Sequence, residues 1–125
     1  MIHLDTSFLI RALARDSPED RDLRARLARA EPLGMSVIAW TEFLCGPVEA
    51  SQVELVLRIV REPIAFIDED AATAARLFNQ AGRRRGSLTD CMIAATAIRA
   101  EAPLATANPK DFRPLEALGL RVLAS

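Results

Sequence analysis

Short apolar runs alternate along the chain with longer segments in which apolar residues recur at helical spacing. The short runs predict buried strands at 2–4, 33–37, 63–67, 103–106 and 120–123. The longer segments predict helices at 7–14, 18–30, 38–44, 47–60, 69–82 and 87–98, with a helical turn at 115–118. Strands that alternate with helices imply right-handed crossovers and a parallel sheet covered on both faces. The length of 125 residues is that of one domain, so we expect a single α/β domain spanning 1–125.

The helix predicted after the third strand illustrates how inward faces are read from spacing. Its residues Ala71, Ala75 and Phe78 lie on one face, which we expect to be buried, and Asp68 is placed to cap its start.

The two cysteines, Cys45 and Cys91, lie in apolar helical patterns. They are typical of small core residues in a reducing compartment rather than of a disulfide.

The composition limits the class of protein. Hydrophobic residues make up 50% and charged residues 26%, enough for a proper core, and the net charge of −1 is not that of a strongly basic nucleic-acid binder. No apolar run reaches the length of a membrane span, and the N-terminus has no secretory pattern. We therefore expect a soluble, cytoplasmic protein that has no contact with a membrane.

Asp5 closes the first strand, where a carboxylate is costly to bury alone. One interpretation is that it caps the helix that follows. The other is that it belongs to a site, because sites form at the carboxyl ends of parallel strands. Further oxygen-bearing side chains fall near the same sheet edge: the acids Glu42, in an otherwise apolar stretch, and Asp90, in the first turn of a helix, and the amide Asn108 or the acid Asp111 after the fourth strand.

Such a gathering of oxygen donors favours Mg²⁺ or Mn²⁺ over zinc, and no His or Cys pair stands at zinc spacing. His3 is interpreted as a strand residue facing a neighbour. A bound divalent ion lowers the pKa of water and stabilises charge on a phosphate, which makes phosphodiester hydrolysis a reasonable chemistry for these acids.

Four short motifs, in this order, resemble those of the PIN-domain ribonucleases, and more narrowly the VapC-type toxins of bacterial toxin–antitoxin pairs. They are Asp5-Thr6-Ser7, Ser36 through Thr41-Glu42, Asp90 through Ala97, and Thr106 through Phe112. The resemblance implies a PIN-like three-layer α/β/α fold with a five-stranded parallel sheet of order 3-2-1-4-5. It also implies an Mg²⁺- or Mn²⁺-dependent endoribonuclease, a homodimer that cleaves RNA and is neutralised by a cognate antitoxin.

The resemblance assigns Asp5, Glu42 and Asp90 as the catalytic and metal-binding acids. The supporting hydroxyls that it implies are those of Thr6, Ser7 and Thr106. Two departures stand out: Ser7 replaces a frequent Asn, and Asn108 stands where many relatives carry an acid. For the fourth ligand we favour Asp111 over Asn108, because a carboxylate supplies charge and an amide does not.

Basic residues near these motifs are candidates for RNA phosphate contacts. They are Arg83, Arg84, Arg85, Lys110 and Arg113. The alternative is that the arginines form only a solvated turn between two glycines.

Two other functions fit parts of the sequence. A phospho-acceptor receiver domain has a similar length and an Asp at the end of its first strand, but this chain lacks the acidic pair and the lysine that receivers use. A PIN-like module that has lost catalysis and binds only RNA or a partner protein is the second, since Ser7 and Asn108 depart from the family pattern.

Overall fold

A parallel sheet forms the centre of the protein in a computed structural model that describes residues 1–60 and 62–124. Its strands are β1 (Ile2–Leu4), β2 (Leu33–Gly34), β3 (Leu104–Thr106) and β4 (Val122–Ala124). They lie in the order β2-β1-β3-β4, and His3 pairs with Gly34 on one side and with Leu104 on the other. The predicted α/β fold with a parallel sheet is confirmed.

The predicted strand at 63–67 forms only a single bridge, in which Ile64 pairs with Ser36 in parallel. The bridge lies just beyond β2, at the position that the order 3-2-1-4-5 gives to the third strand. It extends no further because α3 begins at Val37, and the Ala65 carbonyl instead accepts a 2.8 Å bond from Arg99 Nη2. The prediction was therefore wrong in the extent of this strand.

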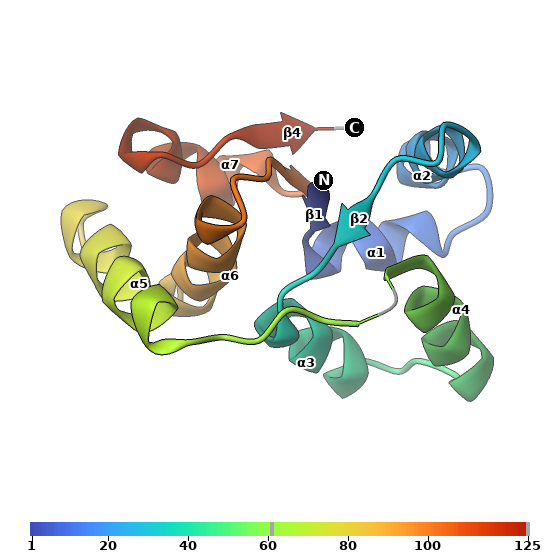
Figure 1. Ribbon diagram of the computed structural model, residues 1–125, viewed down its shortest axis with the longest axis horizontal. Coiled ribbons are helices and arrows are strands. Elements are labelled where there is room, and N and C mark those ends of the chain that lie inside the picture. The colour runs from blue at the N-terminus through green and yellow to red at the C-terminus, as the bar shows by residue number, and fades with distance from the viewer. Residues whose placement is uncertain (61, 125) are drawn as a thin grey trace.

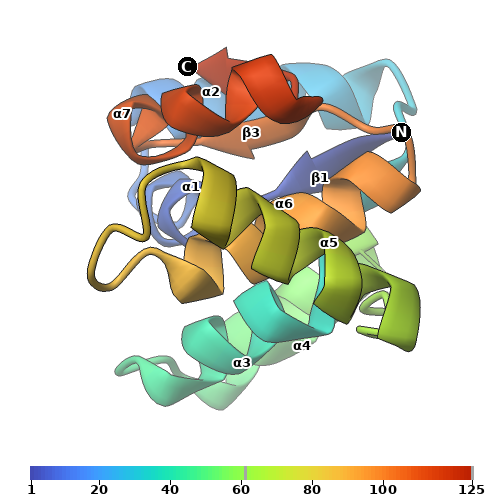
Figure 2. The ribbon, with the colours of Figure 1, turned by 90° about the vertical axis from the view of Figure 1, so that its left-hand side faces the viewer.

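Helices cover both faces of the sheet. They are α1 (Thr6–Ala12), α2 (Pro18–Ala28), α3 (Val37–Cys45), α4 (Ala50–Val60), α5 (Asp68–Gln80), α6 (Leu88–Arg99), the short α7 (Pro109–Phe112) and the 3₁₀ helix η1 (Arg113–Leu118). In Figure 1, α5 and α6 lie on one side of the sheet and α1 and α2 on the other, while α3 and α4 lie beyond β2. Figure 2 shows α5 alongside α6. No helix of the described residues is both long and apolar enough to cross a bilayer.

The core between these layers consists of apolar side chains from nearly every element. Leu4, Phe8, Phe43, Leu104 and Phe112 are fully buried. Truncating a buried Phe to Ala typically costs about 3–5 kcal/mol, so the rings of Phe8, Phe43 and Phe112 are expected to contribute strongly to the stability of this core.

The cysteines do not share one environment. Cys91 is buried in α6, as predicted, but Cys45 is exposed at the end of α3, so its assignment to the core was wrong.

The buried face of α5 differs from the one predicted from spacing. Asp70, Ala74 and Leu77 are buried, whereas Ala71 and Ala75 are exposed. An acid inside an apolar stripe was not expected, but Asp70 Oδ1 accepts a 2.8 Å bond from Arg99 Nε.

Asp70 also forms the cap at the N-terminus of α5. The N-cap position is Ile67 rather than Asp68, and the Ile67 N–H donates to Asp70 Oδ2 at 3.1 Å. The cap predicted at Asp68 was therefore wrong by one residue.

His3 fills a gap that only glycine can leave open. A Cβ on Gly34 would lie 2.9 Å from His3 Cδ2, too close for a real contact. The ring is buried, and neither ring nitrogen has a hydrogen-bond partner in the described residues. Burial, followed by the positive charges of the N-terminus and Arg99, lowers the pKa of His3 to about 4.

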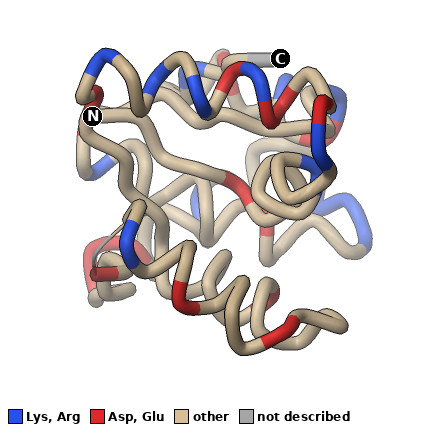
Figure 3. The backbone as a smooth tube through the Cα atoms, turned by 90° about the vertical axis from the view of Figure 1, so that its right-hand side faces the viewer, with Lys and Arg blue, Asp and Glu red and all other residues tan. Residues whose placement is uncertain are grey.

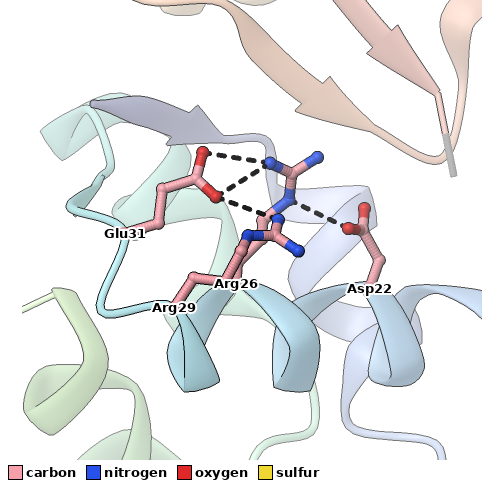
Figure 4. A network of polar contacts seen from close by, with 4 residues as sticks. All are labelled: Asp22, Arg26, Arg29 and Glu31. Carbon is pink, nitrogen blue, oxygen red and sulfur yellow. Dashed lines mark hydrogen bonds and ion pairs between the residues drawn. The ribbon is translucent and has the colours of Figure 1, made fainter.

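Basic and acidic positions are interleaved along α2 (Figure 3). Figure 4 shows the best-connected group: Arg26 Nε lies 2.9 Å from Asp22, and Arg26 Nη1 lies 3.1 Å from Glu31, which also contacts Arg29 at 3.3 Å. Since Arg26 and Arg29 are paired with acids of their own chain, we do not consider them as candidates for a nucleic-acid contact.

Candidate active site

Asp5 lies where β1 ends and α1 begins, next to the end of β3. Its side chain makes no capping bond to α1. Instead Asp5 Oδ2 accepts bonds from Ser7 Oγ at 2.6 Å and Thr106 Oγ1 at 2.9 Å. The capping interpretation is therefore excluded, and two hydroxyls fix the orientation of a buried carboxylate.

The hydroxyls of Ser7 and Thr106 belong to a tight connection across the sheet edge. Ser7 Oγ lies 3.2 Å from Thr106 Oγ1 and accepts a bond from the Ala107 N–H at 3.1 Å, while Thr106 Oγ1 accepts one from the Asn108 N–H at 3.0 Å. A serine at position 7 thus couples α1 to the loop after β3.

Glu42 is held by Thr6, the first residue of α1. The Thr6 hydroxyl lies 3.1 Å from Glu42 Oε1 and 2.9 Å from the Ala39 carbonyl oxygen, which joins α1 to α3. Partial burial raises the pKa of Glu42, and the Asp5 carboxylate adds to this rise, while the Thr6 bond opposes it.

Asp90 lies in the first turn of α6. Burial raises the pKa of Asp90 to about 7, and the negative charges of Asp5, Asp111 and Glu42 contribute in that order. Only Arg84 acts in the opposite direction. Carboxylates from four separate elements therefore share one electrostatic environment.

Three of these acids, Asp5, Glu42 and Asp90, line one open cavity of about 340 Å³. Its walls are formed by Asp5, Thr6, Ser7, Ile10, Glu42, Asp90 and Asn108. Within residues 1–60 and 62–124, no three His, Cys, Asp or Glu side chains come close enough to form a ready-made metal cage. The acids thus face a common space without being in mutual contact.

Asp111 lies on the other side of Asp90. Both acids line a second cavity of about 30 Å³, together with Arg84 and Cys91. Asn108 is therefore the residue of the loop after β3 that borders the cavity of Asp5 and Glu42, whereas Asp111 borders that of Arg84.

The donors around the larger cavity fit a hard divalent cation. Asp5, Glu42 and Asp90 offer carboxylate oxygens, and Asn108 offers an amide oxygen, the donor types that Mg²⁺ and Mn²⁺ prefer. Asp5 accepts its two hydroxyl bonds on Oδ2, and within the described residues Oδ1 accepts none. One oxygen of Asp5 is therefore available to a ligand.

The candidate phosphate-binding residues lie on the loop between α5 and α6 and around α7. Lys110 and Arg113 are exposed around α7. Arg84 and Asp111 contact each other, and Arg83 contacts α5. The Arg84 bond to Asp111 therefore places the loop that carries the three arginines against α7. That these five cations bind phosphate stays a prediction.

Ile10 is the residue at the cavity that the sequence reasoning missed. It is about half exposed and lies in α1, within an apolar run that also contains the buried Phe8 and Leu9. The signal was its position outside the face formed by Phe8, Leu9 and Ala12, which directs it away from the core.

Comparison with known proteins agrees with this architecture. Residues 2–117 match the model of the PIN domain family. Ribonuclease VapC1 of Methanocaldococcus jannaschii is 37% identical over 102 residues, which cover 75% of this chain and 74% of the relative.

Solved structures share the fold at lower identity. VapBC2 from Rickettsia felis, bound to a DNA fragment from its promoter, aligns with a TM-score of 0.77 at 22% identity, over 100% of this chain and 99% of that chain. A toxin–antitoxin complex from Klebsiella pneumoniae aligns with a TM-score of 0.76 at 24% identity, over 98% and 96%. The receiver-domain alternative is thereby set aside, and the chain belongs to the PIN domain family.

Proposed function

We propose that this protein is a divalent-metal-dependent endoribonuclease and the toxin of a toxin–antitoxin pair. The observation that carries the proposal is the cavity lined by Asp5, Glu42, Asp90 and Asn108. The three acids come from separate parts of the chain: Asp5 follows β1, Glu42 lies in α3 and Asp90 lies in α6. The name of the VapC1 relative, a ribonuclease, supports RNA as the substrate.

Each residue has a distinct task in this proposal. Asp5, Glu42 and Asp90 would hold Mg²⁺ or Mn²⁺. The pKa of Asp90 is raised by burial first and then by repulsion from its neighbouring carboxylates, and such a cation would relieve this repulsion. When bound, the cation supplies Lewis acidity to the scissile phosphate and to the attacking water. Ser7 and Thr106 keep Asp5 oriented, and Thr6 does the same for Glu42.

The arrangement favours direct attack of water on phosphorus, which leaves a 5′-phosphate and a 3′-hydroxyl. Attack by the 2′-hydroxyl normally uses a pair of general acid–base groups such as histidines. His3 is the single histidine of the chain, and it is buried against Gly34, away from the cavity lining.

A cleavage assay tests this function. We expect purified protein to cut a fluorescently labelled RNA with Mg²⁺ or Mn²⁺ and to stop with EDTA. Asp5→Asn, Glu42→Gln and Asp90→Asn should each abolish cleavage, while Asp68→Asn, an exposed acid on α5, should not. If Asp90→Asn cut RNA at the wild-type rate, Asp90 would be removed from the site. RNA binding without cleavage by the wild type would favour a PIN-like binding module instead.

The proposed antitoxin has a suitable surface in an apolar groove of about 190 Å³ between α1, α2 and α4. Its apolar lining is Leu9, Leu13, Leu23, Leu27, Leu55 and Ile59. Leu27 and Leu55 are exposed although apolar, and the groove edge carries Asp20 and Arg24. An amphipathic helix would cover the leucines, and at the edge it would meet Asp20 and Arg24, which pair with each other at 2.9 Å.

Two other apolar side chains, Trp40 and Leu44, lie outside the lining of this groove, on α3. Trp40 stacks on Phe43, with ring centroids 5.6 Å apart, and Leu44 is exposed on α3. We propose this part of α3 as a contact of the homodimer. Light scattering of the protein, alone and with the product of a short neighbouring reading frame, tests both partners. A strict monomer that ignores this neighbour would contradict the toxin assignment but not the nuclease.

A further inference from the structure

The loop between α5 and α6 carries three consecutive arginines, Arg83, Arg84 and Arg85. It lies between two glycines with positive φ, Gly82 at 89° and Gly86 at 82°. The loop protrudes from the helices, at the left of Figure 2 and as the blue loop at the right of Figure 3. The three guanidinium groups have three different environments.

Arg83 is fastened to the end of α5. Its φ is 54°, a left-handed value that is unfavourable for a residue other than glycine, and its N–H donates to the Phe78 carbonyl at 2.9 Å. The guanidinium carbon lies 5.5 Å from the centre of the Phe78 ring, and Nη1 donates to Asn79 Oδ1 at 2.6 Å. These contacts hold both the backbone and the side chain of Arg83.

Arg84 fastens the loop to α7. Its Nη2 donates to the Asp111 carbonyl oxygen at 3.2 Å and lies 4.0 Å from Asp111 Oδ1. Its own carbonyl oxygen accepts bonds from Ser87 Oγ at 2.7 Å and from the Ser87 N–H at 3.1 Å. Arg84 therefore connects two segments that are far apart in the sequence.

Arg85 is different, because it is exposed and makes no hydrogen bond, ion pair or ring contact with residues 1–60 and 62–124. We propose that Arg83 and Arg84 are positioning residues of this loop, and that Arg85 alone of the three binds a phosphate of the substrate. This inference rests on the proposed ribonuclease function and assigns the role of each arginine within it.

The contacts that each arginine already makes decide which of them can bind a phosphate. For Arg83 or Arg84 to contact a phosphate, each would first break bonds that it already makes within the chain. Arg85 loses only hydration and side-chain freedom, and its planar fork suits a phosphate oxygen pair. Because Arg83 and Arg84 already hold the loop in place, less conformational entropy is lost when Arg85 binds a phosphate.

The test is the salt dependence of RNA binding. A short 5′-fluorescein oligoribonucleotide is titrated in EDTA, so that it stays uncut, and anisotropy is followed over a range of salt concentrations. Arg85→Ala should weaken binding about three- to tenfold and reduce the slope of log K against log salt by about 0.7, the value for one phosphate on a single strand. Arg85→Lys should restore most of both, since a lysine also neutralises a phosphate.

The positioning residues should behave differently. Arg83→Ala and Arg84→Ala should leave the salt slope unchanged but speed hydrogen exchange in residues 82–87, and lysine should not restore the slow exchange because it lacks the planar fork. Arg21→Ala, an exposed arginine on α2 across the sheet, controls for the loss of one charge.

Two outcomes would overturn the inference. An equal loss of slope in all three alanine variants would show that the loop acts only through its total charge. Cleavage by wild type together with an unchanged slope in Arg85→Ala would refute the phosphate contact while the proposed function stands. Failure of the proposed function would appear separately, as RNA that is bound but never cut.

Discussion

Asp70, which is fully buried, and Asp90, which is partly buried, have opposite electrostatic environments. Asp70 is inaccessible on α5 and receives bonds from Arg99 Nε at 2.8 Å and from the Ile67 N–H at 3.1 Å. Asp90, on the neighbouring helix α6, is partly buried among other carboxylates, and its pKa rises to about 7. One acid is neutralised by its own chain, and the other is left uncompensated.

The difference separates structural acids from site acids. A buried charge with a good partner contributes to a unique packing, whereas buried charges of one sign lower the stability of the fold. A chain that retains the second kind gains from a cation that comes from outside. This comparison makes the cavity of Asp5 and Asp90 the candidate site, and leaves Asp70 out of it.

The largest effect is expected from breaking the compensated pair. Asp70→Asn should lower the free energy of unfolding by up to about 3 kcal/mol, because the fully buried Asp70 side chain loses its charge-assisted bond from Arg99. Urea denaturation measures this. Asp68→Asn, exposed on the same helix, should change stability by no more than about 0.5 kcal/mol. Equal losses in the two variants would contradict a structural role for Asp70.

The next effect concerns His3, a buried group whose ring nitrogens have no hydrogen-bond partner among the residues that the structure describes. Its pKa is about 4 in the folded protein and 6.5 when unfolded, so the unfolded chain takes up the proton first as pH falls. Stability should therefore be full above pH 6.5 and decline towards pH 4, by up to about 3 kcal/mol from this residue.

The measurement is the free energy of unfolding from pH 7.5 to 4 for wild type and His3→Gln. Carboxylates titrate in both proteins, so the difference between the two curves isolates His3. A difference that stays constant over this range would mean that the folded protein protonates His3 as readily as the unfolded chain does.

The sequence predicts the elements of this fold better than their buried faces. Spacing placed α5 correctly but assigned Ala71 and Ala75 to its inner face, because an apolar pattern gives no reason to bury Asp70. That reason is Arg99, a residue 29 positions away that only the packing of α5 against α6 brings near.

The same limit applies to the site. Asp5 was found from its position at the end of a strand, Glu42 from its apolar surroundings and Asp90 from its place at the start of a helix. The resemblance of four motifs then assigned the three acids to one site. The roles of Ser7 and Thr106 depend on hydroxyl geometry, and the separation of Asn108 from Asp111 depends on where α7 turns. The spacing of residues in the sequence predicts neither the geometry of these hydroxyls nor the place where α7 turns.

A smaller effect is expected when one of the carboxylates that repel each other in the site loses its charge. In EDTA at pH 8, Asp90→Asn should raise the free energy of unfolding by about 2 kcal/mol, after allowance for solvent screening of a half-buried group. Because the pKa of Asp90 is raised in the folded protein, the cost of its charge grows as pH rises towards 7. The gain should thus be smaller at pH 5, as thermal or urea unfolding would show. A loss of stability would mean that Asp90 has a structural partner.

The smallest effect distinguishes the two residues after β3. Charge alone favours Asp111 as the fourth ligand, but Asn108 borders the cavity of the three acids, and Asp111 borders that of Arg84. We therefore expect Asn108→Ala to weaken Mn²⁺ binding about fivefold, or about 1 kcal/mol, through loss of a direct oxygen or of its water-mediated substitute.

Asp111→Ala removes only a distant charge, which Arg84 already offsets in part, so its effect should stay below about twofold. Calorimetric titration of Mn²⁺ into both variants compares them directly. The reverse order would mean that α7 moves to bring Asp111 across Asp90 when the cation binds, and the charge argument would then outweigh the geometry of the cavity.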